Sequence, residues 1–185
     1  SQLQRFGMSE EATQLTATWV AAALIAALSI IANFAAKKIV VRLLTHFIQR
    51  NDLKWGNFFV ERKVFHRLSH LVPAIIIYLF AHVFQDYTIV IQKLAVTYMI
   101  VMSLVVINSF LNAVHDIYRM YDISKIRPIK SYVQVAKIVI FFIGGIIIIS
   151  NLIGKSPLII LGGIGALSAV LMLIFQDSIL GFVAG

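Results

Sequence analysis

Residues 158–175 read LIILGGIGALSAVLMLIF, a stretch of eighteen residues without a charged side chain. A helix needs about 20 apolar residues to cross the roughly 30 Å hydrocarbon core of a bilayer. The stretch is therefore predicted to be a transmembrane helix. It decides the fold class, because a helix that is apolar on every side is typical of a membrane span.

Four more apolar stretches precede it, at residues 19–36, 68–84, 89–112 and 133–153. The composition agrees with them, since 60% of the residues are hydrophobic, 13% are charged and the mean hydropathy is +0.91. These values lie outside the range of soluble domains. The sequence thus predicts an all-α integral membrane protein with five transmembrane helices. The chain has no cysteine, which excludes disulfides and thiolate metal sites.

The basic residues predict how the spans are oriented. All of the 16 Lys and Arg residues except Arg5, Lys93 and Lys155 lie at or near the same ends of the expected spans. Basic loops face the cytoplasm, so we expect a periplasmic amino terminus and a cytoplasmic carboxyl end. Because these side chains flank spans, they predict contacts with anionic lipid rather than with nucleic acid. The expected lipid-interface residues are Lys37, Lys38, Arg42, Arg62 and Lys63.

Two features near the amino terminus bear on how the chain meets the membrane. Residues 1–14 are polar and lack the pattern of a cleavable signal peptide, so the first span is expected to be retained. After this span, an amphipathic pattern predicts a helix in the plane of the inner leaflet, together with nearby aromatic residues. A continuous extension of the first helix is an equal alternative. The apolar positions are Val40, Leu43, Leu44, Phe47 and Ile48, and the aromatic ones are Trp55, Phe58 and Phe59.

Polar residues inside the expected spans are few, and none of them is acidic. A proton-coupled or ion-coupled transporter usually places Asp, Glu or His within its spans, so a coupled pump is disfavoured. Lys93 and Lys137 lie within about a turn of a span end, where their ammonium groups can reach the interface. Asn108 and Asn112 lie one turn apart and predict interhelical hydrogen bonds.

No pattern of catalytic or metal-ligating residues stands out. His66 and His70 share a helix face at i, i+4, but no third ligand accompanies them at metal spacing. The run of Gly162, Gly163 and Gly165 lacks the Lys-Ser/Thr of a phosphate-binding loop and lies inside an apolar span. We therefore expect no enzyme activity, no cofactor and no bound metal.

The small residues of the last span predict close helix packing. Gly162 pairs with Ala166 and Gly165 with Ala169 at the spacing that lets two helix backbones approach, and Ser168 adds another small side chain. Such packing needs a partner helix, in the same chain or in another copy.

A polar break follows this span at Gln176 and Asp177, before the apolar residues resume. Asp177 is suited to cap a new helix, because its carboxylate can accept backbone N–H bonds. The sequence therefore predicts a kink at Gln176 and Asp177.

Residues 162–185, GGIGALSAVLMLIFQDSILGFVAG, resemble the pore helix of the small-conductance mechanosensitive channel (MscS) superfamily. The five spans make the chain most similar to the YbdG-like mini-conductance subgroup. The resemblance implies a homoheptamer of the bacterial inner membrane that opens under membrane tension and releases ions and small osmolytes during hypoosmotic shock. It places the pore constriction at Ala169 and Leu173.

The same resemblance implies a division of the chain. Residues 1–132 would form lipid-facing sensor spans, and residues 133–185 the inner span and the pore helix. Members of the family continue into a cytoplasmic β-domain and vestibule, which we expect to be absent from this chain. Val170 and Met172 are bulkier than the family's usual residues, and Asp177 would add a ring of charge that favours cations at the cytoplasmic mouth.

Two other classes of protein compete with this interpretation. A membrane anchor for a downstream cytoplasmic domain would also have several spans, but it would not need self-association through Gly165 and Ala169. A secondary transporter would show an inverted internal repeat, and the sequence shows none.

Overall fold

A computed structural model of the chain describes residues 10–50 and 56–184, so the expected contribution of Trp55 lies outside the described residues. Helix dominates this part of the chain, and no strand occurs in it. The elements in order are α1 Glu10–Arg50, α2 Gly56–Glu61, α3 Val64–Leu68, α4 Leu71–Phe80, the 3-10 helix η2 Ala81–Tyr87, α5 Thr88–Arg119, α6 Ile123–Ile126, α7 Lys130–Ile153 and α8 Pro157–Ala184.

Five helical segments are long and apolar enough to cross a membrane, which confirms the all-α class and the number of spans in the described part. Their limits extend the expected ones by a few residues, because helix continues into the polar flanks. They are Thr16–Ile39, Val64–Phe84, Thr88–Arg119, Lys130–Ile153 and Pro157–Val183.

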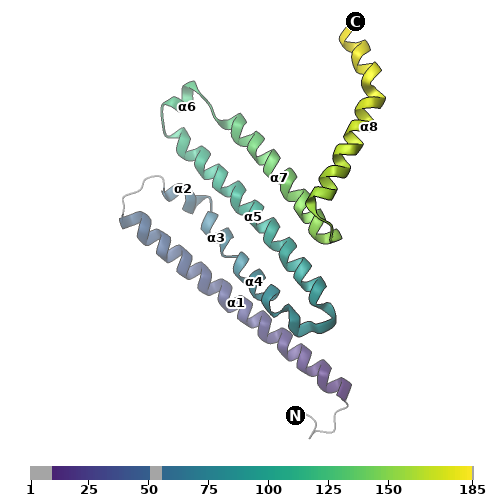
Figure 1. Cartoon of the computed structure of the whole chain (residues 1–185). Coiled ribbons are helices and arrows are strands. Elements are labelled where there is room, and N and C mark those ends of the chain that lie inside the picture. The colour runs from purple at the N-terminus through teal and green to yellow at the C-terminus, as the bar shows by residue number, and fades with distance from the viewer. Residues whose placement is uncertain (1–9, 51–55, 185) are drawn as a thin grey trace.

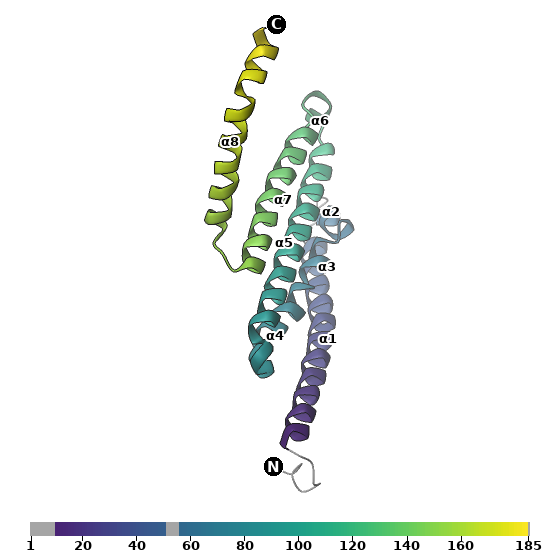
Figure 2. The same cartoon turned by 90° about the vertical axis from the view of Figure 1, so that its right-hand side faces the viewer.

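The first four spans lie side by side in a row. Helix α1 packs on α4, α4 on α5 and α5 on α7, so each helix contacts the next along the row (Figure 1). Helix α8 contacts α7 close to the turn that joins them and then diverges from the row in Figure 1, whereas from the side it runs alongside α7 but apart from it (Figure 2). Four spans therefore form one packed unit, and the fifth stands beside it.

The spans alternate in direction, so that both basic connections come to one end of the row. The segment around α2, with Arg62 and Lys63, and the segment around α6, with Lys125 and Arg127, lie at the same end (Figure 1). This is the arrangement that the charge pattern predicts for a five-span protein. The side of the membrane that this end faces stays a prediction.

The second span is broken into α3, α4 and η2 rather than formed by one helix. Lys63 takes a left-handed conformation, with φ 54° and ψ 29°, just before α3 begins. A turn at Ser69 and His70 separates α3 from α4, and Pro73 follows in the first turn of α4, where a missing backbone N–H is tolerated. The Ser69 hydroxyl donates to the carbonyl of His66 at 2.7 Å, which stabilises the turn.

Helix α7 ends at Gly154, which adopts φ 76°, the left-handed conformation that glycine permits at a helix end. The backbone N–H groups of Gly154 and Lys155 both donate to the carbonyl of Ser150, at 2.8 and 3.1 Å. Pro157 then opens α8, at a position where its fixed φ suits a new helix. This short turn reverses the chain and sends α8 away from α7.

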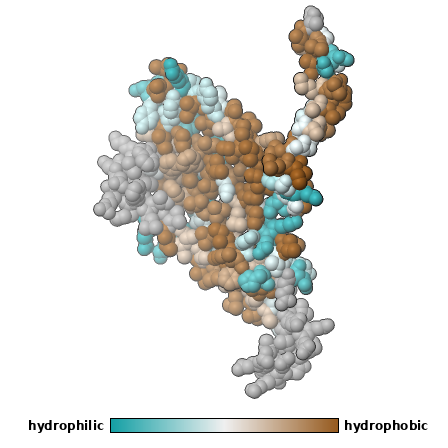
Figure 3. Space-filling view, viewed as in Figure 1, coloured by the Kyte–Doolittle hydropathy of each residue, from teal (hydrophilic) through white to brown (hydrophobic). Residues whose placement is uncertain are grey.

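Helix α8 runs from Pro157 to Ala184 without interruption, including Gln176 and Asp177. The kink expected there is not confirmed. Sharp kinks have local causes such as proline, a π-bulge or an inserted side chain, and nothing in a single copy presses on this part of α8. The surface is mostly apolar across the row and along α8 (Figure 3).

The backbone of α1 is one helix through Arg50. It therefore matches the alternative of a continuous extension of the first span, rather than a separate helix beginning after that span. Phe59 lies at the end of the row, where its ring centroid is 5.5 Å from that of Phe110 in α5 and 6.3 Å from that of Phe65. This ring thus helps to join α2 to the row.

Candidate functional site

The residues that the sequence assigns to a pore all lie on α8, and all of them are exposed. Leu173 is 72% exposed, and no residue of the span Pro157–Val183 is buried within the chain. The Ser168 hydroxyl donates to the carbonyl of Ile164 at 2.8 Å, so it is satisfied within α8 and needs no partner in another helix. The structure thus brings these residues onto one helix, where the described part of the chain does not bury them.

Side-chain size divides α8 into two faces. Residues four apart share a face of a helix, so Gly165, Ala169 and Leu173 form a line, which Gly162 and Ala166 widen. Large side chains such as Leu167 and Leu171 project from the opposite side. Gln176 continues the line of small residues, and Asp177 lies at its edge. One face of α8 therefore combines small residues, the expected constriction and the polar break.

The glycines of α8 border open space in a single copy. A Cβ atom built on Gly162, Gly163, Gly165 or Gly181 would meet nothing within 4 Å. Small residues in membrane helices permit close backbone approach, but here no helix of the chain makes use of it. Among the described residues, therefore, no helix packs closely against these glycines.

Gly144 of α7 differs from the glycines of α8, because a side chain of another helix packs directly against it. A Cβ atom added there would lie 2.5 Å and 2.6 Å from the two methyl carbons of Leu104 in α5. Gly144 is buried, while its neighbour Gly145 would meet nothing within 4 Å. The Leu104 side chain therefore occupies the place that a side chain on residue 144 would need, and α5 and α7 pack closely at this point.

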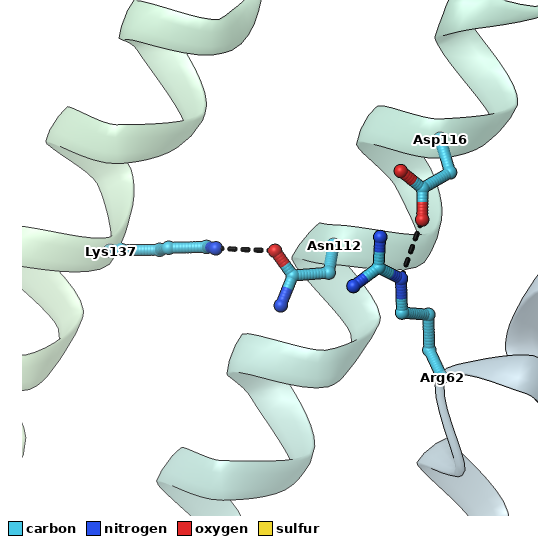
Figure 4. A network of polar contacts seen from close by, with 4 residues as sticks. All are labelled: Arg62, Asn112, Asp116 and Lys137. Carbon is cyan, nitrogen blue, oxygen red and sulfur yellow. Dashed lines mark hydrogen bonds and ion pairs between the residues drawn. The ribbon is translucent and has the colours of Figure 1, made fainter.

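Polar contacts fasten α5 to the helices on both sides of it. The Lys137 ammonium donates to Oδ1 of Asn112 at 2.6 Å, and Arg62 pairs with Asp116 one turn further along α5 (Figure 4). The sequence predicted an interhelical bond for Asn112, which is confirmed. Lys137 was expected to turn toward the interface, but instead it holds α7 to α5.

A second polar contact joins α5 and α7 near their other ends. Nδ2 of Asn151 donates to the carbonyl of Lys93 and to Oγ1 of Thr97, both at 2.9 Å. Asn151 was not among the residues predicted from the sequence to form such bonds. The signal was an amide near the end of an apolar helix, where a polar group needs a partner because lipid offers none.

Arg62, one of the expected lipid-interface residues, donates from Nε to Oδ2 of Asp116 at 2.6 Å. The hydrogen bond to Asp116 raises the pKa of Arg62 above the ordinary value for arginine. The two side chains are 46% and 16% exposed, so water screens the pair and its stabilisation is modest. This contact connects the polar end of α2 with α5.

The other residues expected at the lipid interface lie at the same basic end. Lys38, Arg42 and Lys63 are exposed, and Lys37 is partly buried. His66 and His70 contact each other edge to face, with ring centroids 5.5 Å apart. Among the described residues there is no group of three His, Asp or Glu side chains that could hold a metal ion.

A comparison of the sequence with models of known protein families finds no match. A comparison with solved structures finds none either. The function must therefore be argued from the residues and contacts of this chain.

Proposed function

We propose that the protein is a mechanosensitive channel of the bacterial inner membrane, in which several copies of α8 line a pore that opens under membrane tension. The observation that carries the proposal is that α8 is apolar, unburied in its own chain and lined on one face by small residues with open space around them. A helix of this kind is stabilised by packing against others like it. In channels of the superfamily that this chain resembles, seven copies surround the pore, and we propose the same number here.

In the closed state, Leu173 of each copy would form an apolar ring, with Ala169 one turn away. Water finds no hydrogen-bond partners in a narrow apolar ring, and an ion cannot cross a dry constriction cheaply. The ring therefore closes the pore by excluding water. Asp177 follows on the cytoplasmic side, where a ring of carboxylates would attract cations.

Tension does work on whichever state occupies more area in the membrane. It therefore shifts the population toward an expanded, tilted ring of α8 helices, provided that this state is only a few kcal/mol above the closed one. The turn at Gly154 would serve as the joint between α7 and α8, and the expected kink at Gln176 and Asp177 would form as copies press on one another. The row of α1, α4, α5 and α7, in which polar contacts join α5 to α7, would transmit the movement of the surrounding lipid.

Replacing Leu173 by Ser tests the gate. A hydroxyl on every copy offers water a hydrogen-bond partner in the constriction, so the variant should open at lower tension than the unmodified protein. The measurement is the opening threshold in excised membrane patches. Leu171→Ser, on the opposite face of α8, is the matched control and should leave the threshold close to its original value. An unchanged threshold for Leu173→Ser would count against this gate.

A membrane anchor for a cytoplasmic domain is the alternative, and cross-linking separates the two. The chain has no cysteine, so a single cysteine reports one position without background. Ala169→Cys should form disulfide-linked copies in oxidised membranes, whereas Leu171→Cys, on the other face, should form few. Equal cross-linking of both variants, or of neither, would contradict the packing of copies through the small-residue face and would favour the anchor.

A further inference from the structure

A pocket of about 490 Å³ lies between α4 and α5. It is lined by Pro73, Ala74 and Ile77 of α4 and by Leu94, Ala95 and Tyr98 of α5. The volume falls in the roughly 300–1,000 Å³ range of small-molecule sites. Because Leu94 is 58% exposed and Tyr98 is 43% exposed, the pocket opens to the outside of the row. In a membrane, its mouth faces lipid.

A cation lies on the same pair of spans, toward the basic end. Arg67 of α3 donates from Nη1 to Oγ of Ser109 at 2.5 Å, and to the carbonyl of Val105 over a longer 3.5 Å. Both acceptors are uncharged, and no carboxylate lies within ion-pair distance of Arg67 in the described part of the chain. A guanidinium has five N–H donors, so most of the N–H groups of Arg67 remain available to an anionic ligand.

Arg67 and the pocket are aligned along α5. Residues seven apart lie on nearly the same face of a helix, so Val105, which Arg67 contacts, continues the line of Tyr98 in the pocket. Seven residues correspond to about 10 Å of helix. Ser109, which accepts the shorter of the two hydrogen bonds, lies about 16 Å along α5 from Tyr98. The cation therefore lies about two to three turns from the pocket along the same face, at the end of the spans that carries the basic connections.

We propose that this is a phospholipid site, in which Arg67 binds the phosphate and an acyl chain fills the pocket between α4 and α5. The arrangement needs a ligand with an anion at one end and an apolar chain at the other. A second copy of this protein suits it poorly, because the chain has 16 basic against 8 acidic residues and the nearby carboxylate of Asp116 already pairs with Arg62. The bilayer supplies such a ligand. The site depends on residence in a membrane and not on channel activity.

A single tryptophan in the pocket reports the bound chain. In the full chain, Trp19 and Trp55 are replaced by Phe and Tyr98 by Trp, and the protein is placed in phosphatidylcholine vesicles. Phosphatidylglycerol with brominated acyl chains, which quench tryptophan, should quench at about a tenfold lower mole fraction than brominated diacylglycerol, which lacks phosphate. This ratio corresponds to one charge-assisted hydrogen bond.

Variants that change the charge test whether Arg67 causes the preference for phosphatidylglycerol over diacylglycerol. Arg67→Gln should abolish the difference between the two brominated lipids, whereas Arg67→Lys should keep most of it. Arg119→Gln removes an exposed charge at the same end of the row and should keep all of it. Because Arg67→Lys preserves the charge, a loss of preference in this variant as complete as in Arg67→Gln would overturn the role of charge.

Three other results would overturn the site. Equal quenching by both lipids in the protein with Arg67 intact would mean that bulk lipid alone fills the pocket. No quenching by either lipid would mean that another part of the assembly covers it. Release of the quenching lipid by inorganic phosphate alone would mean that Arg67 binds a soluble anion independently of the pocket.

Discussion

Helices α7 and α8 are both apolar spans that contain neighbouring glycines, yet the structure uses them in opposite ways. In α7, Gly144 is closed off by Leu104, and Lys137 and Asn151 bond to α5. In α8, a Cβ on Gly162 or Gly165 would meet nothing within 4 Å. Glycine therefore permits close packing between two helices of the chain in α7, whereas in α8 no described helix packs against it.

We propose that this difference separates the part of the protein that packs within one copy from the part that packs between copies. Apolar burial alone does not hold membrane helices together, since lipid is as apolar as the helix surface. Close packing at Gly144 and polar bonds hold α5 and α7 together instead. Helix α8 has the small residues for close packing, but no described helix packs against them, which is why we propose that other copies do so.

The largest expected effect is at Gly144. Gly144→Val places methyl groups where the Leu104 side chain lies, and such overpacking costs about 1–3 kcal/mol. We expect thermal unfolding in detergent to show that the variant loses stability by an amount near the upper end of this range. Adding Leu104→Ala should restore part of the lost stability, because the smaller side chain leaves room for the valine at position 144.

Two matched variants sharpen the contrast. Gly145→Val, on the neighbouring residue with open space, should leave the unfolding temperature nearly unchanged. Gly165→Val in α8 should also leave a single chain as stable as before, but it should reduce the cross-linking of Ala169→Cys. If Gly165→Val destabilised the isolated chain as much as Gly144→Val does, the two helices would not differ in the way that we infer.

The five spans could be predicted because they depend on composition and length, and the interhelical bond of Asn112 because an amide in lipid needs a partner. The partners themselves could not be predicted. The sequence around Gly144 and Gly165 does not indicate which of the two packs against Leu104, since that depends on the rotation of α7 about its axis relative to α5. Pro73 was a signal for a helix start near that position in the second span, but the continuous apolar composition of residues 68–84 favoured a single helix.

The polar contact between Lys137 and Asn112 should have the next largest effect. Interhelical hydrogen bonds within membranes contribute about 0.6 kcal/mol on average and up to about 1.7 kcal/mol, and a charged donor favours the upper half of that range. A double-mutant cycle with Lys137→Met and Asn112→Leu should therefore give a coupling of about 1 kcal/mol in equilibrium unfolding. A coupling near zero would show that α5 and α7 are held by packing at Gly144 alone.

The ion pair of Arg62 and Asp116 should have the smallest effect, because water reaches it. Exposed pairs contribute about 0.2–1 kcal/mol, so Arg62→Gln and Asp116→Asn should each lower stability by about 0.5 kcal/mol, and the loss should shrink in about 1 M salt. Replacing Lys125 by Gln tests the more exposed pair with Asp122 and should cost less.

The pH dependence of this pair follows from the raised pKa of Arg62. A group with a raised pKa in the folded state stabilises the fold below its unfolded pKa and loses that contribution only as the pH rises through the folded value. For an arginine both values are strongly alkaline. The difference in stability between the unmodified protein and Arg62→Gln should therefore stay constant as the pH is raised from neutral to moderately alkaline values. A difference that fell over this interval would show that a lysine or histidine, and not Arg62, holds α2 to α5.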